Sequence, residues 1–129
     1  MPAPATVAGA DPFDLPEWLG TGEVTWSAQS SVRAGPRVSG ELTAGDDRLA
    51  CDLLAADEAF PVPVLDERWR HDAHQAWTHG QVLLVEYDGR LTLAVPGTRF
   101  TADRVLETLG RLAKAVGVKP DQFVATLRL

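Results

Sequence analysis

The dipeptide Asp88-Gly89 limits the fold of this chain more than any other feature of its sequence. It stands between two apolar runs, QVLLVEY at residues 81–87 and RLTLAV at residues 90–95. Aspartate followed by glycine readily adopts the positive φ angles that a two-residue hairpin turn requires. The sequence therefore predicts an antiparallel hairpin at this place, and this is the strongest hairpin signal in the chain.

Three further strands are predicted before this hairpin, and one after it. Apolar residues alternate with polar ones over residues 24–32, 38–42 and 49–53, and the turn-forming sequences AGPR and AGDD separate these runs. Alternation with period two is typical of half-buried strands, and short turns favour antiparallel neighbours. The final stretch, FVATLRL at residues 123–129, alternates in the same way and predicts a last strand.

Two helices are predicted from their capping residues. Asp66 is a suitable N-cap for a helix that ends near Thr78, with Gly80 as its C-terminal glycine. Thr101 begins a second helix, whose apolar stripe is Val105, Leu106, Leu109, Leu112, Ala113 and Val116. The element order is βββ-α-ββ-α-β. We therefore expect an α+β fold, with a mostly antiparallel sheet of five to six strands and two helices on one face.

Length and composition indicate one domain without disulfides. The 129 residues fit a single α+β domain over residues 11–129, preceded by a flexible Ala/Pro-rich tail at residues 1–10. The single cysteine, Cys51, excludes an internal disulfide. The first ten residues lack the apolar core of a signal peptide, and no apolar run approaches the roughly 20 residues of a membrane helix. We expect a cytoplasmic protein without a membrane partner.

The charge distribution disfavours nucleic acid as a partner. The net charge is −6, and the sequence pI is about 4.9. Residues 1–67 carry 12 acidic and 3 basic side chains, whereas residues 68–129 carry 6 acidic and 9 basic ones. Nucleic-acid-binding domains usually have a high pI or a basic stripe. The asymmetry either orients two copies or a partner by complementary charge, or it reflects two ordinary solvated faces.

The segment DPFDLPEWLG at residues 11–20 is too apolar for a free linker. Phe13, Leu15 and Trp18 are candidate partner-docking residues. The segment either packs on its own domain or docks on a second copy or another protein.

All three histidines lie between residues 71 and 79. Glu67, His71 and His74 share one ridge of the predicted helix and offer ligand types that zinc accepts. A convex helix face lacks the pocket and supporting hydrogen bonds of a metal site, so a solvated face is favoured over this weak metal candidate. A dimer contact or a pH-sensing role is a further alternative. No resident metal or cofactor is expected.

The sequence PGTRFTAD at residues 96–103 is a candidate anion site. Thr98, Arg99, Thr101 and Arg104 surround the predicted N-terminus of the second helix, where free amides and the helix dipole favour an anion. Thr101 as an ordinary N-cap explains the same residues without a ligand. Cys51 has no neighbouring base in sequence, and no Ser-His-Asp pattern is present, so no catalytic residue is assigned.

Three stretches resemble conserved, uncharacterised proteins of actinobacterial type: DPFDLPEWLG, ACDLLA and HGQVLLVEYDGRLTLAVPGTRFTADRVLE. This resemblance implies no activity, cofactor or site residue. The element order is also similar to the secretion-chaperone-like fold, a dimerising binding domain, from which the last strand departs. Fold alone does not decide function.

These observations favour a small non-enzymatic module that binds a protein or peptide partner as a homodimer. The alternative is a small-molecule or anion-binding protein, including an enzyme, that uses residues 97–104. A metal-dependent enzyme using Glu67, His71 and His74 ranks third.

Overall fold

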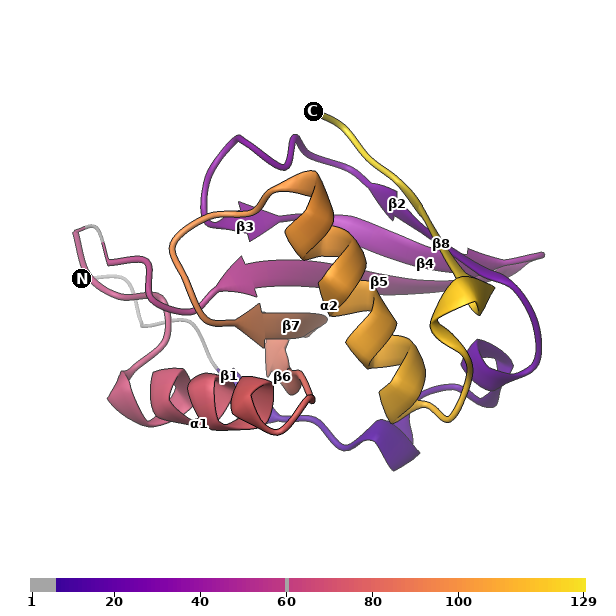
Figure 1. The fold of residues 1–129 in the computed structure, drawn as a ribbon, viewed down its shortest axis with the longest axis horizontal. Helices are drawn as coiled ribbons and strands as arrows, with labels where there is room; N and C mark the ends of the chain where they lie inside the picture. The colour runs from indigo at the N-terminus through magenta and orange to yellow at the C-terminus, as the bar shows by residue number, and fades with distance from the viewer. Residues whose placement is uncertain (1–6, 60) are drawn as a thin grey trace.

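In the computed structural model, which describes residues 7–59 and 61–129, an eight-stranded sheet carries two α-helices (Figure 1). The strands lie in the order β1-β6-β7-β5-β4-β2-β8, and β3 pairs with β5 off this path. The strands are β1 (Val7–Gly9), β2 (Val24–Ala28), β3 (Arg37–Val38), β4 (Gly40–Ala44), β5 (Asp47–Ala55), β6 (Leu83–Tyr87), β7 (Arg90–Val95) and β8 (Phe123–Thr126). The helices are α1 (Glu67–Thr78) and α2 (Ala102–Ala115), with short 3-10 turns η1 (Pro12–Asp14), η2 (Glu17–Gly20) and η3 (Pro120–Gln122).

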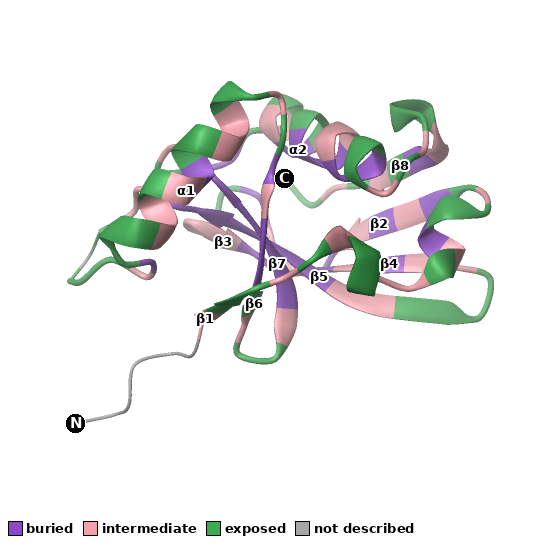
Figure 2. Cartoon of the chain, turned by 90° about the horizontal axis from the view of Figure 1, so that it is seen from below, coloured by how far each residue is buried: buried purple, intermediate pink, exposed green. Residues whose placement is uncertain are grey.

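Two of the strand pairs are parallel, which makes the sheet mixed. β5 pairs with β7 in parallel because α1 and β6 lie between them in the chain and return it to the same end of the sheet. β8 pairs with β2 in parallel after α2 crosses the sheet. The other pairs are antiparallel, and Figure 2 shows β6 and β7 running steeply across the direction of β2 and β4. The sheet is therefore strongly twisted.

The local predictions from turn and cap residues are confirmed. Asp88 and Gly89 have φ angles of 52° and 76° between the paired strands β6 and β7. The Asp66 carboxylate accepts a hydrogen bond from the Trp69 amide at 3.0 Å and begins α1. Thr101 begins α2 in the same way, by accepting from the Arg104 amide at 3.2 Å.

Three details of the predicted strands are wrong. The sheet has eight strands instead of five to six, because β1 has no alternating pattern to mark it and because the strand predicted over residues 38–42 is divided into β3 and β4. Residues 7–9, expected in the tail, form β1 on the free edge of β6, and residues 1–6 lie outside the described part of the chain. The order βββ-α-ββ-α-β holds only when the short strands β1 and β3 are set aside.

The two helices pack against opposite faces of the β5–β7–β6 region, contrary to the expectation of one shared face. Neighbouring residues in a strand point to opposite faces. Leu53 and Leu93 belong to the buried cluster that includes Leu109 of α2, whereas the adjacent Leu54 and Ala94 pack with Leu65 and Ala73 before and within α1. This arrangement was not predicted from the sequence, although the ends of β5 and β7 carry buried apolar side chains on both faces.

Gly40 explains how the large Trp26 fits on the α2 side of the sheet. A Cβ atom at Gly40 would lie 2.3 Å from the Trp26 ring, so any larger residue would displace the indole. The buried Trp26 Nε1 donates to the Cys51 carbonyl at 2.9 Å, which satisfies its single polar group.

Candidate functional site

The aspartate within β5 forms a buried ionic cluster that the sequence analysis missed. The fully buried Asp52 carboxylate accepts from Arg37 Nη2 at 2.7 Å, from Arg90 Nε and Nη2 at 2.9 Å each, and from the Gly40 amide at 3.2 Å. Burial alone would raise the pKa of Asp52, but these hydrogen bonds outweigh it and hold the pKa below its ordinary value. The cluster ties β3, β5 and β7 together.

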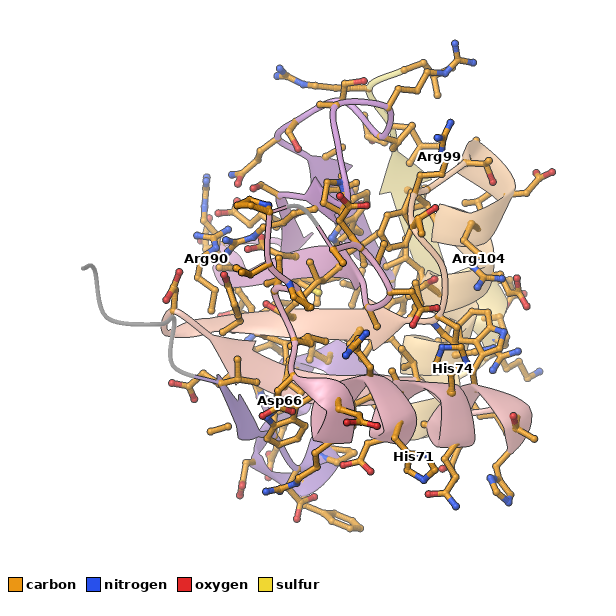
Figure 3. The ribbon with its side chains drawn as sticks, turned by 90° about the vertical axis from the view of Figure 1, so that its left-hand side faces the viewer. Asp66, His71, His74, Arg90, Arg99 and Arg104 are labelled. Atoms are coloured by element: carbon orange, nitrogen blue, oxygen red, sulfur yellow. The ribbon has the colours of Figure 1, made fainter. Side chains whose placement is uncertain are left out.

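This cluster lies on the face of the sheet away from α2. Figure 3 shows Arg90 on that side, apart from Arg99, Arg104 and His74. The Arg37 guanidinium also stacks over the Tyr87 ring, 4.8 Å from its centroid. Because the bonding capacity of Asp52 is filled by its own chain, we assign the cluster a structural role.

A second aspartate lies just beyond the carboxyl end of β5, beside the end of β7. His74 Nε2 of α1 lies 2.8 Å from both carboxylate oxygens of Asp57. The Gly97 amide donates to the same carboxylate at 2.7 Å, and the Asp57 amide donates back to the Gly97 carbonyl at 2.9 Å. Burial acts to raise the pKa of Asp57, but the bonds from His74 and Gly97 lower it below its ordinary value.

Three of the four predicted anion-site residues line one hollow at this end of the sheet. Thr98, Arg99 and Thr101 border a space of about 520 Å³, here called the arginine hollow, together with Arg33, Glu58 and Phe100. Arg33 comes from the loop after β2, and no local sequence signal connected it to residues 96–103. Two arginines face one glutamate here, so the described lining has an excess of positive charge.

Arg104, the fourth predicted residue, does not line the arginine hollow. Its Nη2 donates to the Pro96 carbonyl at 2.6 Å, and its guanidinium stacks over Trp77 at 4.5 Å from the ring centroid. Arg111, two turns further along α2, stacks on the same ring at 3.4 Å. Both arginines therefore fasten α2 to the end of α1 through cation–π contacts.

A second hollow, of about 470 Å³, is lined by residues from the C-terminal parts of α1 and α2, from the start of β6 and from the N-terminal segment. We call it the helix-end hollow. Its lining includes the apolar Pro12, Val82 and Leu84, and three side chains that can carry positive charge: His79, Arg111 and Lys114. None of its described lining residues is acidic. The hollow thus combines apolar walls with a cationic rim.

The three predicted docking residues have different environments. Leu15 and Trp18 are partly buried and pack against the core of their own chain, and the neighbouring Leu19 is fully buried. Phe13 is 94% exposed in η1, directly after Pro12 of the helix-end hollow. Residues 11–20 therefore pack in cis and leave one aromatic ring in solvent.

The side chains of the weak metal candidate Glu67, His71 and His74 do not converge on a common point. His74 turns to Asp57, while Figure 3 shows His71 pointing away from it on the other side of α1. Within residues 7–59 and 61–129, no group of three or more His, Cys, Asp and Glu side chains is placed to hold a metal ion.

The Cys51 thiol is fully buried on the α2 side of the sheet. Desolvation raises the pKa of the thiol far above its ordinary value, and the neighbouring Asp52 charge adds to this effect. A thiol in this environment stays protonated and is a poor nucleophile.

Comparisons with protein-family models, with curated proteins and with solved structures found no match to this chain. In the part of the chain that the structure describes, no helix has the length and apolar character needed to cross a membrane.

Proposed function

We propose that this protein is a small non-enzymatic interaction module that binds a protein or peptide partner, as a homodimer, through Phe13 and the helix-end hollow. The observation that carries the proposal is the 94% exposed Phe13 ring beside a hollow with apolar walls and a cationic rim. Exposed aromatic side chains are costly to leave in water and are enriched at binding hot spots.

The backbone around Phe13 supports this role. The Asp11 carboxylate accepts from the Phe13 amide at 2.9 Å, and the Ala10 amide donates to the Leu84 carbonyl of β6 at 3.0 Å. The turn is thus bonded on its N-terminal side to the sheet, and Leu15 packs on the core on its other side. A ring presented on an ordered turn loses little conformational entropy when it binds.

Photo-crosslinking tests this function in cells. Phe13 is replaced by the photoreactive analogue p-benzoylphenylalanine, and Val62, which is 68% exposed at another place on the surface, is replaced in the same way as a control. We expect ultraviolet-dependent crosslinks, to the same chain or to another protein, at position 13 well above those at position 62. Equal yields at both positions would contradict the proposal.

The arginine hollow favours a second candidate function, the binding of a small anion. Arg33, Arg99 and two threonines line it, and arginine forms charge-assisted hydrogen bonds to phosphate or carboxylate. Under this candidate, inorganic phosphate raises the melting temperature of the wild-type protein. Arg33→Ala and Arg99→Ala should remove the increase, whereas Arg128→Ala, at an exposed position outside the hollow, should retain it. An unchanged increase in the first two variants would end this candidate.

A further inference from the structure

The occupant of the helix-end hollow can be inferred from charge. Phe13 stands between Asp11 and Asp14, both exposed, so its ring is presented together with negative charge. The hollow beside it is lined by His79, Arg111 and Lys114 and by no described acidic residue. The aromatic acidic turn and the apolar cationic hollow are thus complementary to one another.

Arg111 keeps part of its bonding capacity free for such a partner. Its Nη1 donates to the Trp77 and Gln81 carbonyls at 2.7 and 3.0 Å, and its Nη2 donates to Glu107 at 3.3 Å. A guanidinium has five N–H donors, so the Nε–H and one Nη2–H have no partner among these bonds. The bonds already made fix the guanidinium in place, and Lys114, one turn further along α2, is exposed.

Phe13 does not fill the hollow of its own chain, because 94% of the residue is exposed. Pro12 lines the hollow, and Phe13 directly follows it, so the inserted group and the receiving site are neighbours on one surface. A surface that holds both halves of a contact side by side is what a two-fold symmetric dimer requires, since each copy then donates and receives at once.

We propose that Phe13 of a second copy of this chain occupies the helix-end hollow, reciprocally in both copies, with Asp11 and Asp14 facing Arg111 and Lys114 of the opposite copy. This inference rests on the proposed function and names its partner. An acidic, aromatic segment of another protein would use the same features, and the experiment separates the two occupants.

The test is sedimentation equilibrium of the full chain over a concentration series. We expect a dimer for the wild type, with a dissociation constant raised roughly tenfold or more by Phe13→Ala, as for loss of a buried aromatic anchor. The control Val62→Ala, which removes an exposed apolar side chain outside the helix-end hollow, should leave the dissociation constant unchanged. The circular dichroism of Phe13→Ala should not change, because the ring is almost wholly in solvent within the single chain. The melting temperature should match that of the wild type at concentrations where both are monomeric, and should fall below it where the wild type is a dimer.

Charge reversal gives a second, independent readout. Asp14→Lys and Lys114→Glu should each weaken self-association, because each places like charges across both contacts of the dimer. Mixing the two variants should restore dimers. One contact of the mixed pair then joins the two introduced charges, which are opposite in sign, and the other contact joins the original Asp14 and Lys114.

A dimer that is insensitive to Phe13→Ala, or a mixture that fails to associate while the wild type does, would overturn the inference. A wild-type chain that stays monomeric would also overturn it. If position 13 then crosslinks only to a different protein, the partner-binding role of the proposed function still holds; if it crosslinks to nothing, both fail.

Discussion

Asp52 and Asp57 lie five residues apart in the chain, and both carboxylates have a lowered pKa, yet their surroundings differ. Asp52 is fully buried and accepts from two arginines and a backbone amide. Asp57 lies at the end of the sheet, where its side chain keeps 31% of its exposure and that of its partner His74 keeps 53%.

The difference shows how burial separates a carboxylate that holds strands together from one that stays accessible to solvent. A fully buried ion pair is costly to break, because the remaining charge loses its partner where water cannot replace it. A solvent-facing pair contributes little, since water and salt compensate for its loss. Asp52 therefore serves the fold, while the Asp57–His74 pair stays accessible to solvent.

The largest effect is expected for Asp52→Ala. The substitution leaves Arg37 and Arg90 facing one another and removes the acceptor of the Gly40 amide. We expect the free energy of unfolding to fall by about 3 kcal/mol, the lower end of the range for breaking a buried pair, because the arginines can turn partly into solvent. Urea denaturation measures this loss.

Asp47→Ala is the matched control, since it removes an exposed aspartate from the start of the same strand. Its effect should stay within about 0.5 kcal/mol. Similar losses for the two variants would show that the comparison between buried and exposed carboxylates is mistaken.

An effect of intermediate size is expected when acid protonates Asp52 and Asp57, because the folded protein then loses stability. Their pKa values in the folded protein lie below the ordinary 3.8, so the unfolded chain binds protons first as the pH falls. Their contribution to stability is complete above the ordinary pKa and is lost as the pH falls through the folded values. Urea midpoints measured from about pH 5 downward should therefore decrease, less steeply in Asp57→Asn than in the wild type. Parallel curves for the two proteins would argue against the lowered pKa of Asp57.

The smallest effect is expected for His74→Ala. Because the pair is largely exposed, the loss of stability should be at most about 1 kcal/mol, and the Gly97 amide keeps its bond to Asp57. Urea denaturation of the wild type and of the variant measures this loss. A loss as large as that of Asp52→Ala would place His74 among the structural residues.

Features set by neighbouring residues could be predicted from the sequence. The Asp88-Gly89 turn and the Asp66 and Thr101 caps depend on a few adjacent residues, and all are present. The parallel pairing of β5 with β7 could not be predicted, since it depends on how α1 and β6 return the chain.

The candidate sites were harder to predict, because distant segments build them. A charged residue inside the apolar run ACDLLA was a signal that Asp52 needs cationic partners, but Arg37 and Arg90 are 15 and 38 residues away. Arg104 bonds to Pro96 of the predicted segment, but its stacking on Trp77 of α1 could not be predicted from neighbouring residues. The helix-end hollow exists only where two helices from separate parts of the chain meet.

Because Cys51 is buried, the rate at which its thiol is chemically labelled can be used to measure how often the structure opens. The single thiol lies in the centre of the sheet and is fully buried, so a thiol reagent can reach it only when the surrounding strands separate. When opening and closing are fast relative to the reaction, the labelling rate measures the population of open molecules. Dimer formation or ligand binding at either hollow would then be visible as slower labelling, without any added probe.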